Sequence, residues 1–170
     1  KSLMRELLKI GERARKASLI KIQKNQKNTV LKDYCLQLKK NKNLIIKENH
    51  KDLKQALKKG LKDNLVNRLT LNEKKIEEII ISIKKIIKLN DPTNIVLEKW
   101  KRPNGLYISK ISIPIGVIGV IYESRPNVTS DVACLCFKSG NPAILKGGSE
   151  AFYSNKILSK LFRRSLKKNK

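Results

Sequence analysis

The chain has 170 residues, of which 39 are Lys or Arg and 14 are Asp or Glu, so its formal net charge is +25. This length suits one domain or part of a larger one, and 40% apolar residues are enough to form a buried core. The longest nearly uncharged apolar run, residues 111–122, is too short to span a membrane. The three cysteines have neither the spacing of a disulfide framework nor that of a zinc site. These features exclude membrane-spanning and disulfide-rich classes and favour a soluble protein of a reducing compartment.

The basic excess is unevenly distributed along the chain. Residues 1–100 carry 26 basic and 11 acidic groups, residues 101–150 carry 6 and 3, and residues 151–170 carry 7 and none. A large positive charge suits nucleic-acid binding, but no nucleic-acid-binding motif is visible. Lys, Ile and Asn are abundant together, as drift toward A/T-rich codons would produce. We therefore favour a compositional origin and expect no specific nucleic-acid partner, with a basic nucleic-acid-binding module as the alternative.

Residues 1–93 are predicted to be helical, because their apolar residues recur at helical spacing. Ser18 and Asn43 are candidate caps for a second and a third helix. The sequence Thr70-x-x-Glu73 has the pattern of a capping box ahead of an apolar run. The helix that it would start places isoleucines on one face, from Ile76 to Ile87.

The pattern changes after this helical part. Residues 94–113 contain two extended segments joined by a turn at 103–105, which predicts a β-hairpin. Residues 115–121 are apolar and β-branched, as in a strand buried on both faces of a parallel sheet, and residues 142–145 form another such segment. A helix is expected after each, so residues 114–170 read as βαβα. The predicted fold class is α/β, with N-terminal helices, a β-hairpin and then a βαβα unit.

Two loops are candidate binding sites, because ligands of such sheets lie beyond the carboxyl ends of the strands. The loop 146–149 combines a cation, two glycines and a hydroxyl at the start of a helix, where backbone N–H groups favour anions. An ordinary capped helix start with a solvated lysine would have the same sequence. Both interpretations of this loop remain open on sequence alone.

The loop 122–127 is polar directly after a buried strand. Asn127 could donate an amide N–H into a cleft, as an oxyanion-binding group does, and Arg125 could bind a phosphate or carboxylate. An ordinary turn is the alternative. Cys134 and Cys136 lie mid-helix among apolar neighbours, which favours core packing. The residues alone do not assemble a nucleophile, a base and an orienting group.

Two long motifs carry a resemblance to a known family. They are IPIGVIGVIYESRPNVTSD at 113–131 and KSGNPAILKGGSEA at 138–151, and KRPNGL at 101–106 and RLTL at 68–71 agree with them. With these motifs the chain resembles gamma-glutamyl phosphate reductase (glutamate-5-semialdehyde dehydrogenase), a family of the aldehyde dehydrogenase superfamily. The resemblance runs along the whole chain.

The resemblance implies an activity and an architecture. The family reduces L-glutamyl 5-phosphate with NADPH to L-glutamate 5-semialdehyde and phosphate, in cytoplasmic proline biosynthesis, as a homo-oligomer. It implies that residues 1–93 are the helical part of a cofactor-binding domain, that residues 94–113 are a bridging hairpin, and that residues 114–170 are the first part of a Rossmann-like sheet.

The resemblance also implies roles for particular residues and no metal. Asn127 would support the oxyanion, whereas Lys146, Ser149 and Glu150 would contact the cofactor, with Lys146 near the 2′-phosphate of NADPH. Arg125 is a hypothetical substrate ligand. The catalytic cysteine and the oligomerisation element of the family lie beyond the matched part, and neither Cys134 nor Cys136 matches that cysteine. We therefore expect a fragment that is inactive alone, with a non-functional gene remnant as another alternative.

Overall fold

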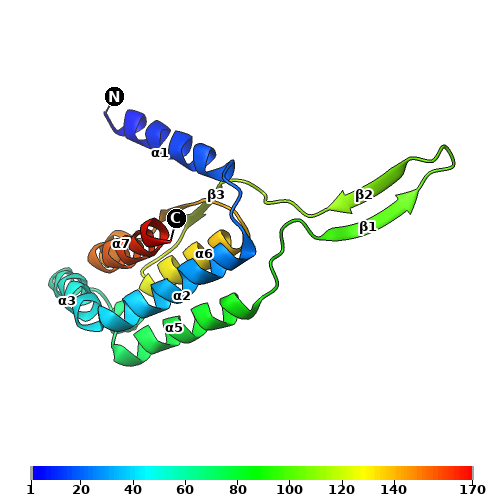
Figure 1. Cartoon of the computed structure of the whole chain (residues 1–170). Coiled ribbons are helices and arrows are strands. Elements are labelled where there is room, and N and C mark those ends of the chain that lie inside the picture. Colours follow the sequence, from blue (N-terminus) through cyan, green and yellow to red (C-terminus); the bar gives the residue numbers. More distant parts are fainter. Residues whose placement is uncertain (1, 170) are drawn as a thin grey trace.

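The computed structural model describes residues 2–169, and Figure 1 shows how their elements are arranged. Five helices come first: α1 (Ser2–Ser18), α2 (Lys24–Lys40), α3 (Lys42–Lys58), α4 (Asp63–Leu69) and α5 (Glu73–Lys88). The strands β1 (Val96–Lys101), β2 (Tyr107–Ile111) and β3 (Ile118–Ile121) follow. The chain continues through α6 (Pro126–Lys138), β4 (Ala143–Lys146), a short 3-10 turn η1 (Ser149–Ala151) and α7 (Phe152–Lys168).

The core lies where α2, α5, α6 and α7 pack together. The predicted isoleucine face of α5 is confirmed, since Ile76, Ile79, Ile80, Ile83 and Ile86 are all buried. Tyr34 of α2 is fully buried against them, and its hydroxyl shares a 2.7 Å hydrogen bond with Ser130 of α6. An apolar helix face that excludes water on packing is the main source of stability of such a core.

Two of the predicted helix caps are wrong by a few residues. Ser18 ends α1 and its hydroxyl donates to the carbonyl of Arg15 at 2.7 Å, so α2 begins only after Gln23. Asn43 lies in the first turn of α3, which follows α2 almost without a break across Asn41. Local side-chain chemistry allowed these caps, but the actual helix boundaries lie elsewhere.

The predicted capping box at Thr70 is also replaced by another arrangement. The oxygen of the Asn72 side chain accepts a hydrogen bond from the Lys75 N–H at 2.9 Å and caps α5. The hydroxyl of Thr70 donates instead to the Val66 carbonyl at 2.8 Å. The physical reason is the short helix α4, which was not expected and which uses Thr70 at its C-terminal end.

The strands form two separate two-stranded sheets. β1 and β2 pair antiparallel as a hairpin that projects from the helical body, with Gly105 in the left-handed region at φ +88°. β3 and β4 pair parallel and are connected by α6, and α7 follows β4. The predicted βαβα order is therefore confirmed.

The composition of residues 115–121 predicted a strand buried on both faces, and for β3 this prediction is wrong. Ile121 is 87% exposed, and the residues of β3 alternate between half-buried and exposed. The reason is that within residues 2–169 its sheet contains only β4 as a partner.

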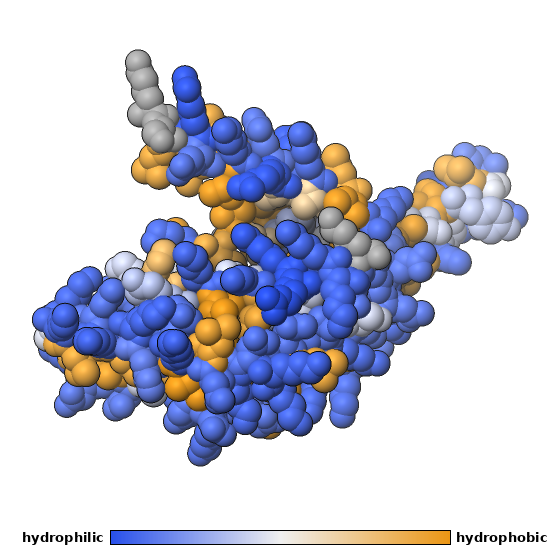
Figure 2. Space-filling model, turned by 60° about the vertical axis from the view of Figure 1, so that its left-hand side comes forward, coloured by the Kyte–Doolittle hydropathy of each residue, from blue (hydrophilic) through white to orange (hydrophobic). Residues whose placement is uncertain are grey.

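The helix α1 stands apart from the other helices (Figure 1) and leaves apolar side chains exposed, among them Leu3, Met4, Leu7 and Leu8. Figure 2 shows apolar surface around the hollow between α1 and the rest of the molecule. Across residues 2–169, none of the helices has the length and apolar character needed to cross a membrane.

Candidate functional site

The two predicted loops lie next to each other, because β3 and β4 are parallel and end at the same edge. The Tyr122 N–H donates to the Lys146 carbonyl at 3.1 Å and extends the pairing of the strands. The Ser124 hydroxyl donates to the Glu150 carboxylate at 3.1 Å. Residues that follow different strands are thereby brought together at one edge.

The two glycines of the second loop lie close to neighbouring side chains. A Cβ on Gly147 would overlap the side-chain amide of Asn155 and would lie 3.0 Å from the Tyr122 ring. A Cβ on Gly148, whose φ is −59°, would lie 2.7 Å from a carboxylate oxygen of Glu150. The backbone conformation of Gly148 is open to any residue. Glycine at 147 therefore keeps space between Asn155 and Tyr122, whereas the atom near Gly148 is the flexible end of the Glu150 side chain.

The three candidate cofactor-binding residues lie on this second loop and on η1. The Lys146 side chain is exposed, and its Nζ donates to the Gly147 carbonyl at 3.1 Å. Ser149 is exposed and its hydroxyl donates to Glu150 at 3.3 Å. A hydrogen bond from its own backbone N–H holds the pKa of Glu150 below its usual value, and the hydroxyls of Ser124 and Ser149 add to this effect. Glu150 is thus a carboxylate at neutral pH.

Lys146, Gly147, Gly148 and Ser149 line a large open cavity of about 1070 Å³. Residues of α1, α2, α6, β4 and α7 and of the segments next to them form the rest of its lining. Its size and its exposed cation and hydroxyl suit a large anionic ligand. Ligand sites for drug-sized molecules typically reach about 300–1,000 Å³.

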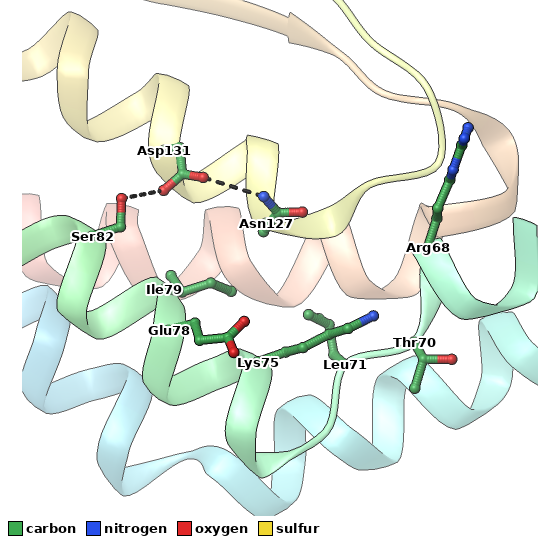
Figure 3. A pocket seen from close by; sticks show the side chains of 9 residues that line it. All are labelled: Arg68, Thr70, Leu71, Lys75, Glu78, Ile79, Ser82, Asn127 and Asp131. Atoms are coloured by element: carbon green, nitrogen blue, oxygen red, sulfur yellow. Dashed lines mark hydrogen bonds between the residues drawn. The ribbon is translucent and has the colours of Figure 1, made fainter. Parts of the chain in front are cut away.

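Asn127 lies in a different and smaller cavity, of about 220 Å³, which we call the Asn127 pocket (Figure 3). Its lining comes from the C-terminal end of α4 and the residues after it, from α5 and from α6: Arg68, Thr70, Leu71, Lys75, Glu78, Ile79, Ser82, Asn127 and Asp131. The Asn127 Nδ2 donates to Asp131 Oδ2 at 3.3 Å, and the Ser82 hydroxyl donates to Asp131 Oδ1 at 3.0 Å. Asp131 therefore orients the amide of Asn127 from one turn further along α6.

The Asn127 pocket contains charged residues for which the sequence predicted no role. Figure 3 shows Asn127 and Asp131 on one side, Lys75 and Glu78 on the other, and Arg68 at one end. The four residues from α5 recur at positions 75, 78, 79 and 82, which is the spacing of one helix face. That spacing was visible in the sequence, but nothing there indicated that this face lies opposite Asn127.

Arg125 precedes α6 and its side chain is exposed. It is not among the residues that line the Asn127 pocket. Its suggested contact with the substrate stays a prediction.

The core packing predicted for Cys134 and Cys136 is confirmed, and Cys35 is buried as well. Cys35, Cys134 and Cys136 are all buried, and burial raises the pKa of each thiol, that of Cys134 most strongly. A thiol is a poor nucleophile when it is protonated and inaccessible. Among residues 2–169 there is also no group of three His, Cys, Asp or Glu side chains that could hold a metal ion.

Comparisons with known proteins agree on one enzyme family. The chain is 46% identical over 168 residues to gamma-glutamyl phosphate reductase of Clostridium botulinum (strain Alaska E43) and 45% identical over 166 residues to that of Carboxydothermus hydrogenoformans. These matches cover 98% and 96% of this chain but only 41% and 40% of the relatives. No family model matches the chain. The chain thus spans about two fifths of the length of the curated relatives it matches.

Solved structures give the same result. The crystal structure of gamma-glutamyl phosphate reductase from Thermotoga maritima superimposes with a TM-score of 0.93 at 40% identity, over 96% of this chain and 40% of that one. The crystal structure of the enzyme from Saccharomyces cerevisiae superimposes with a TM-score of 0.89 at 34% identity, over 94% of this chain and 41% of that one. A putative aldehyde dehydrogenase from Bacillus subtilis, at 16% identity and a TM-score of 0.69, has the same fold. Along nearly its whole length, the chain is therefore related to the N-terminal part of gamma-glutamyl phosphate reductase, within the aldehyde dehydrogenase fold.

Proposed function

We propose that the chain provides the cofactor-binding region and the oxyanion-supporting amide of a gamma-glutamyl phosphate reductase. The reaction is the NADPH-dependent reduction of L-glutamyl 5-phosphate to L-glutamate 5-semialdehyde and phosphate, a cytoplasmic step of proline biosynthesis. The observation that carries the proposal is the position of Asn127, oriented by Asp131 at the side of a small charged pocket. The relatedness to the reductases supports the same activity.

The size of the large cavity supports a dinucleotide as its ligand. Lys146 and Ser149 are exposed at its edge, and Glu150 is a carboxylate on the same turn. We infer that Ser149 and Glu150 bind the adenosine ribose and that Lys146 contacts the 2′-phosphate, which would favour NADPH over NADH. The bound cofactor would supply a hydride to the substrate. The protein supplies only the charges and hydrogen bonds that hold it.

Asn127 would act on the reacting carbonyl group. Attack of a nucleophile on an acyl phosphate turns the carbonyl oxygen into an oxyanion, which needs a positioned hydrogen-bond donor. The amide of Asn127 has two N–H groups, and one of them donates to Asp131 at 3.3 Å. The second N–H is free for the substrate oxygen. Asp131, held in turn by Ser82, fixes the direction in which that N–H points.

The nucleophile is not one of the three cysteines of this chain, since all three are buried with raised pKa values. We infer that the chain alone binds NADPH but does not reduce the substrate. In the complete enzyme, residues 1–93 and 114–170 would form part of the cofactor-binding domain, with the hairpin of residues 94–113 as a bridge toward an oligomerisation element.

A chimera tests the function. This chain replaces the matching 168 residues of the Clostridium botulinum relative, and NADPH oxidation that depends on L-glutamyl 5-phosphate is measured. The chimera is expected to be active, and Asn127→Ala should lower its kcat about 10²–10³-fold because one oxyanion donor is lost. The exposed Asn43 provides the control, and Asn43→Ala should leave kcat unchanged. A folded but inactive chimera, or full activity of Asn127→Ala, would contradict the proposal.

Titration of NADPH into the 170-residue chain itself tests the cofactor site. Lys146→Ala should weaken binding of NADPH more than binding of NADH, because the lysine is assigned to the 2′-phosphate. The exposed Lys160 on α7 provides a matched control. Equal weakening for the two cofactors would argue against that assignment.

A further inference from the structure

The large cavity has an apolar part away in sequence from the loop 146–149, which we call the apolar floor. Its side chains come from the segment before α2, from α2, from α6 and from α7: Ile22, Val30, Phe137, Leu158, Phe162 and Leu166. Val30 is 2% exposed and Leu158 is fully buried, so the cavity reaches the hydrophobic core. The rings of Phe137 and Phe162 meet edge to face with their centroids 5.8 Å apart. The apolar floor is therefore a hollow into the core.

The end of α1 forms another wall of this hollow. Ala17 in α1 and Ile20 just after it line the cavity, and Ile20 is 64% exposed. Figure 1 shows α1 set apart from α2 and α7, and Figure 2 shows apolar surface around the opening that this leaves. Apolar surface in contact with water on several sides of one hollow favours an apolar ligand, because binding removes that surface from water. An alkyl chain has the shape and the chemistry for this space.

The charged residues that line the cavity are all cationic. Within residues 2–169 they are Lys21, Lys146, Lys156 and Arg163, and no Asp or Glu is among the lining residues. Lys21 and Arg163 adjoin the apolar residues in sequence, are exposed, and have no ion pair in this part of the chain. A guanidinium binds a carboxylate through two parallel hydrogen bonds, and a lysine adds a second positive charge. The cavity thus suits an anionic group next to an alkyl chain.

We propose that the apolar floor binds the alkyl chain of a long-chain fatty acid and that Arg163 and Lys21 bind its carboxylate. The inference goes beyond the proposed function, because a dinucleotide has no alkyl chain and its assigned contacts are Lys146, Ser149 and Glu150. A single fatty acid fits these observations better than a bilayer does, since the apolar floor lies inside a hollow.

Calorimetric titration of the 170-residue chain with octanoate, decanoate and laurate, each below its critical micelle concentration, tests the apolar part. Successive members differ by two CH₂ groups. Each step should tighten binding about tenfold, because complete burial of one CH₂ changes an affinity about three- to fourfold. One molecule should bind per chain. Dodecyltrimethylammonium has the same chain length as laurate and a cationic head, and it should bind at least about tenfold more weakly.

Leu166→Gln and Ile22→Gln test the apolar floor itself. Each should weaken binding of laurate about tenfold or more, because the alkyl chain would lie against a polar group that has no partner. Leu57→Gln is the matched control, since Leu57 is 64% exposed and lies outside the cavity lining. It should leave laurate binding unchanged. Far-UV circular dichroism and thermal melting of each variant report whether it is folded.

Arg163→Gln tests the contact with the carboxylate. It should weaken binding of octanoate, decanoate and laurate by the same factor, about tenfold, and leave the steps between them unchanged. A merely structural role of Arg163 would not preserve those steps. Lys160→Gln removes an exposed charge of the same helix outside the lining and should have no effect. Lys146→Ala should weaken NADPH binding and leave laurate binding unchanged.

Several results would overturn the proposal. They are no saturable binding of laurate, affinity that does not rise with chain length, equal binding of dodecyltrimethylammonium, and unchanged laurate binding in the folded Leu166→Gln and Arg163→Gln variants. Binding to phosphatidylglycerol vesicles without saturable laurate binding would assign the apolar surface to a membrane. Sedimentation that shows a dimer, dissociated by Leu166→Gln, without laurate binding would assign it to a second copy of the chain.

Titration of NADPH into the same samples separates this inference from the proposed function. NADPH binding that depends on Lys146, together with no binding of laurate, defeats only the fatty-acid site. Laurate binding with the expected chain-length steps, together with no binding of NADPH, defeats the proposed cofactor site and leaves the fatty-acid site standing.

Discussion

The carboxylate of Asp52 in α3 accepts hydrogen bonds from both the backbone N–H and the hydroxyl of Ser154 in α7, at 2.8 and 2.6 Å. It also accepts the N–H of Tyr153 at 3.0 Å. The first N–H groups of a helix have no partners within the helix, so Asp52 caps α7 from a distance of about 100 residues in sequence. One turn earlier in α3, Asn49 donates to the Ser154 hydroxyl at 2.9 Å. This network attaches the start of α7, and with it the loop 146–149, to the helical part.

Asp52→Ala should therefore lower the free energy of unfolding by about 2–4 kcal/mol, because two N–H groups at the start of α7 lose their acceptor. Urea denaturation measures the change. The exposed Glu77 of α5 is the control, and Glu77→Ala should change stability by less than about 0.5 kcal/mol. Equal changes in the free energy of unfolding for the two substitutions would contradict a stabilising role of the Asp52 network.

Gly147→Ala should lower the free energy of unfolding by about 1–3 kcal/mol, the usual cost of overpacking. The added methyl group would meet Asn155 and the Tyr122 ring. Gly119 in β3 is the matched control, because a Cβ there has nothing within 4 Å. Thermal melting should show a clear loss for the first variant and little change for the second. A Gly147→Ala variant as stable as Gly119→Ala would contradict the close packing of the two loops.

The stability of the chain should depend on pH through the ion pair between Lys27 and Asp91. The Lys27 Nζ lies 2.9 Å from Asp91 Oδ2, and the two side chains are only 2% and 12% exposed, respectively. Burial raises the pKa of Asp91, but hydrogen bonds from Lys27 and Thr93 outweigh it and hold the pKa below its ordinary 3.8. A lowered pKa means that the stabilisation is complete above about pH 4 and is lost as the pH falls through the folded-state value.

Asp91→Asn should accordingly destabilise the chain by about 3–5 kcal/mol near neutral pH, since Lys27 is left buried without its counter-charge. Urea denaturation of both proteins should give a constant difference from about pH 7 to pH 5, and the difference should shrink below about pH 4. If the difference in unfolding free energy between the two proteins grew on acidification, the result would contradict a lowered pKa of Asp91.

The three thiols should react slowly with alkylating reagents in the folded chain at about pH 8, because burial protects them and raises their pKa values. All three should react rapidly in guanidinium chloride. Ser109→Cys places a thiol on the exposed face of the hairpin and should add one fast-reacting group to the folded protein. Rapid labelling of Cys134 in the native chain would show that it is accessible and would reopen it as a candidate nucleophile.

Much of the fold could be predicted from local patterns. The isoleucine period of α5 and the order of β3, α6, β4 and α7 depend on residues close together in sequence. Helix boundaries were less predictable, because neighbouring elements compete for the same residues: Thr70 ends α4, and Asn72 starts α5. The exposure of Ile121 could not be predicted either, because it depends on which strands pair with β3.

The sequence by itself determined the order of the elements from α5 to α7, the meeting of the loops 122–127 and 146–149 and the relationship to the reductases. These follow from local periodicity, from parallel strand pairing and from motif similarity. Only the tertiary structure decided that Asn127 and Lys146 line different cavities. It also decided that Arg68, Lys75 and Glu78 line the same pocket as Asn127. The reason is physical: which helix faces meet is determined by the packing of α5 against α6, a contact between segments about 50 residues apart that no local pattern records.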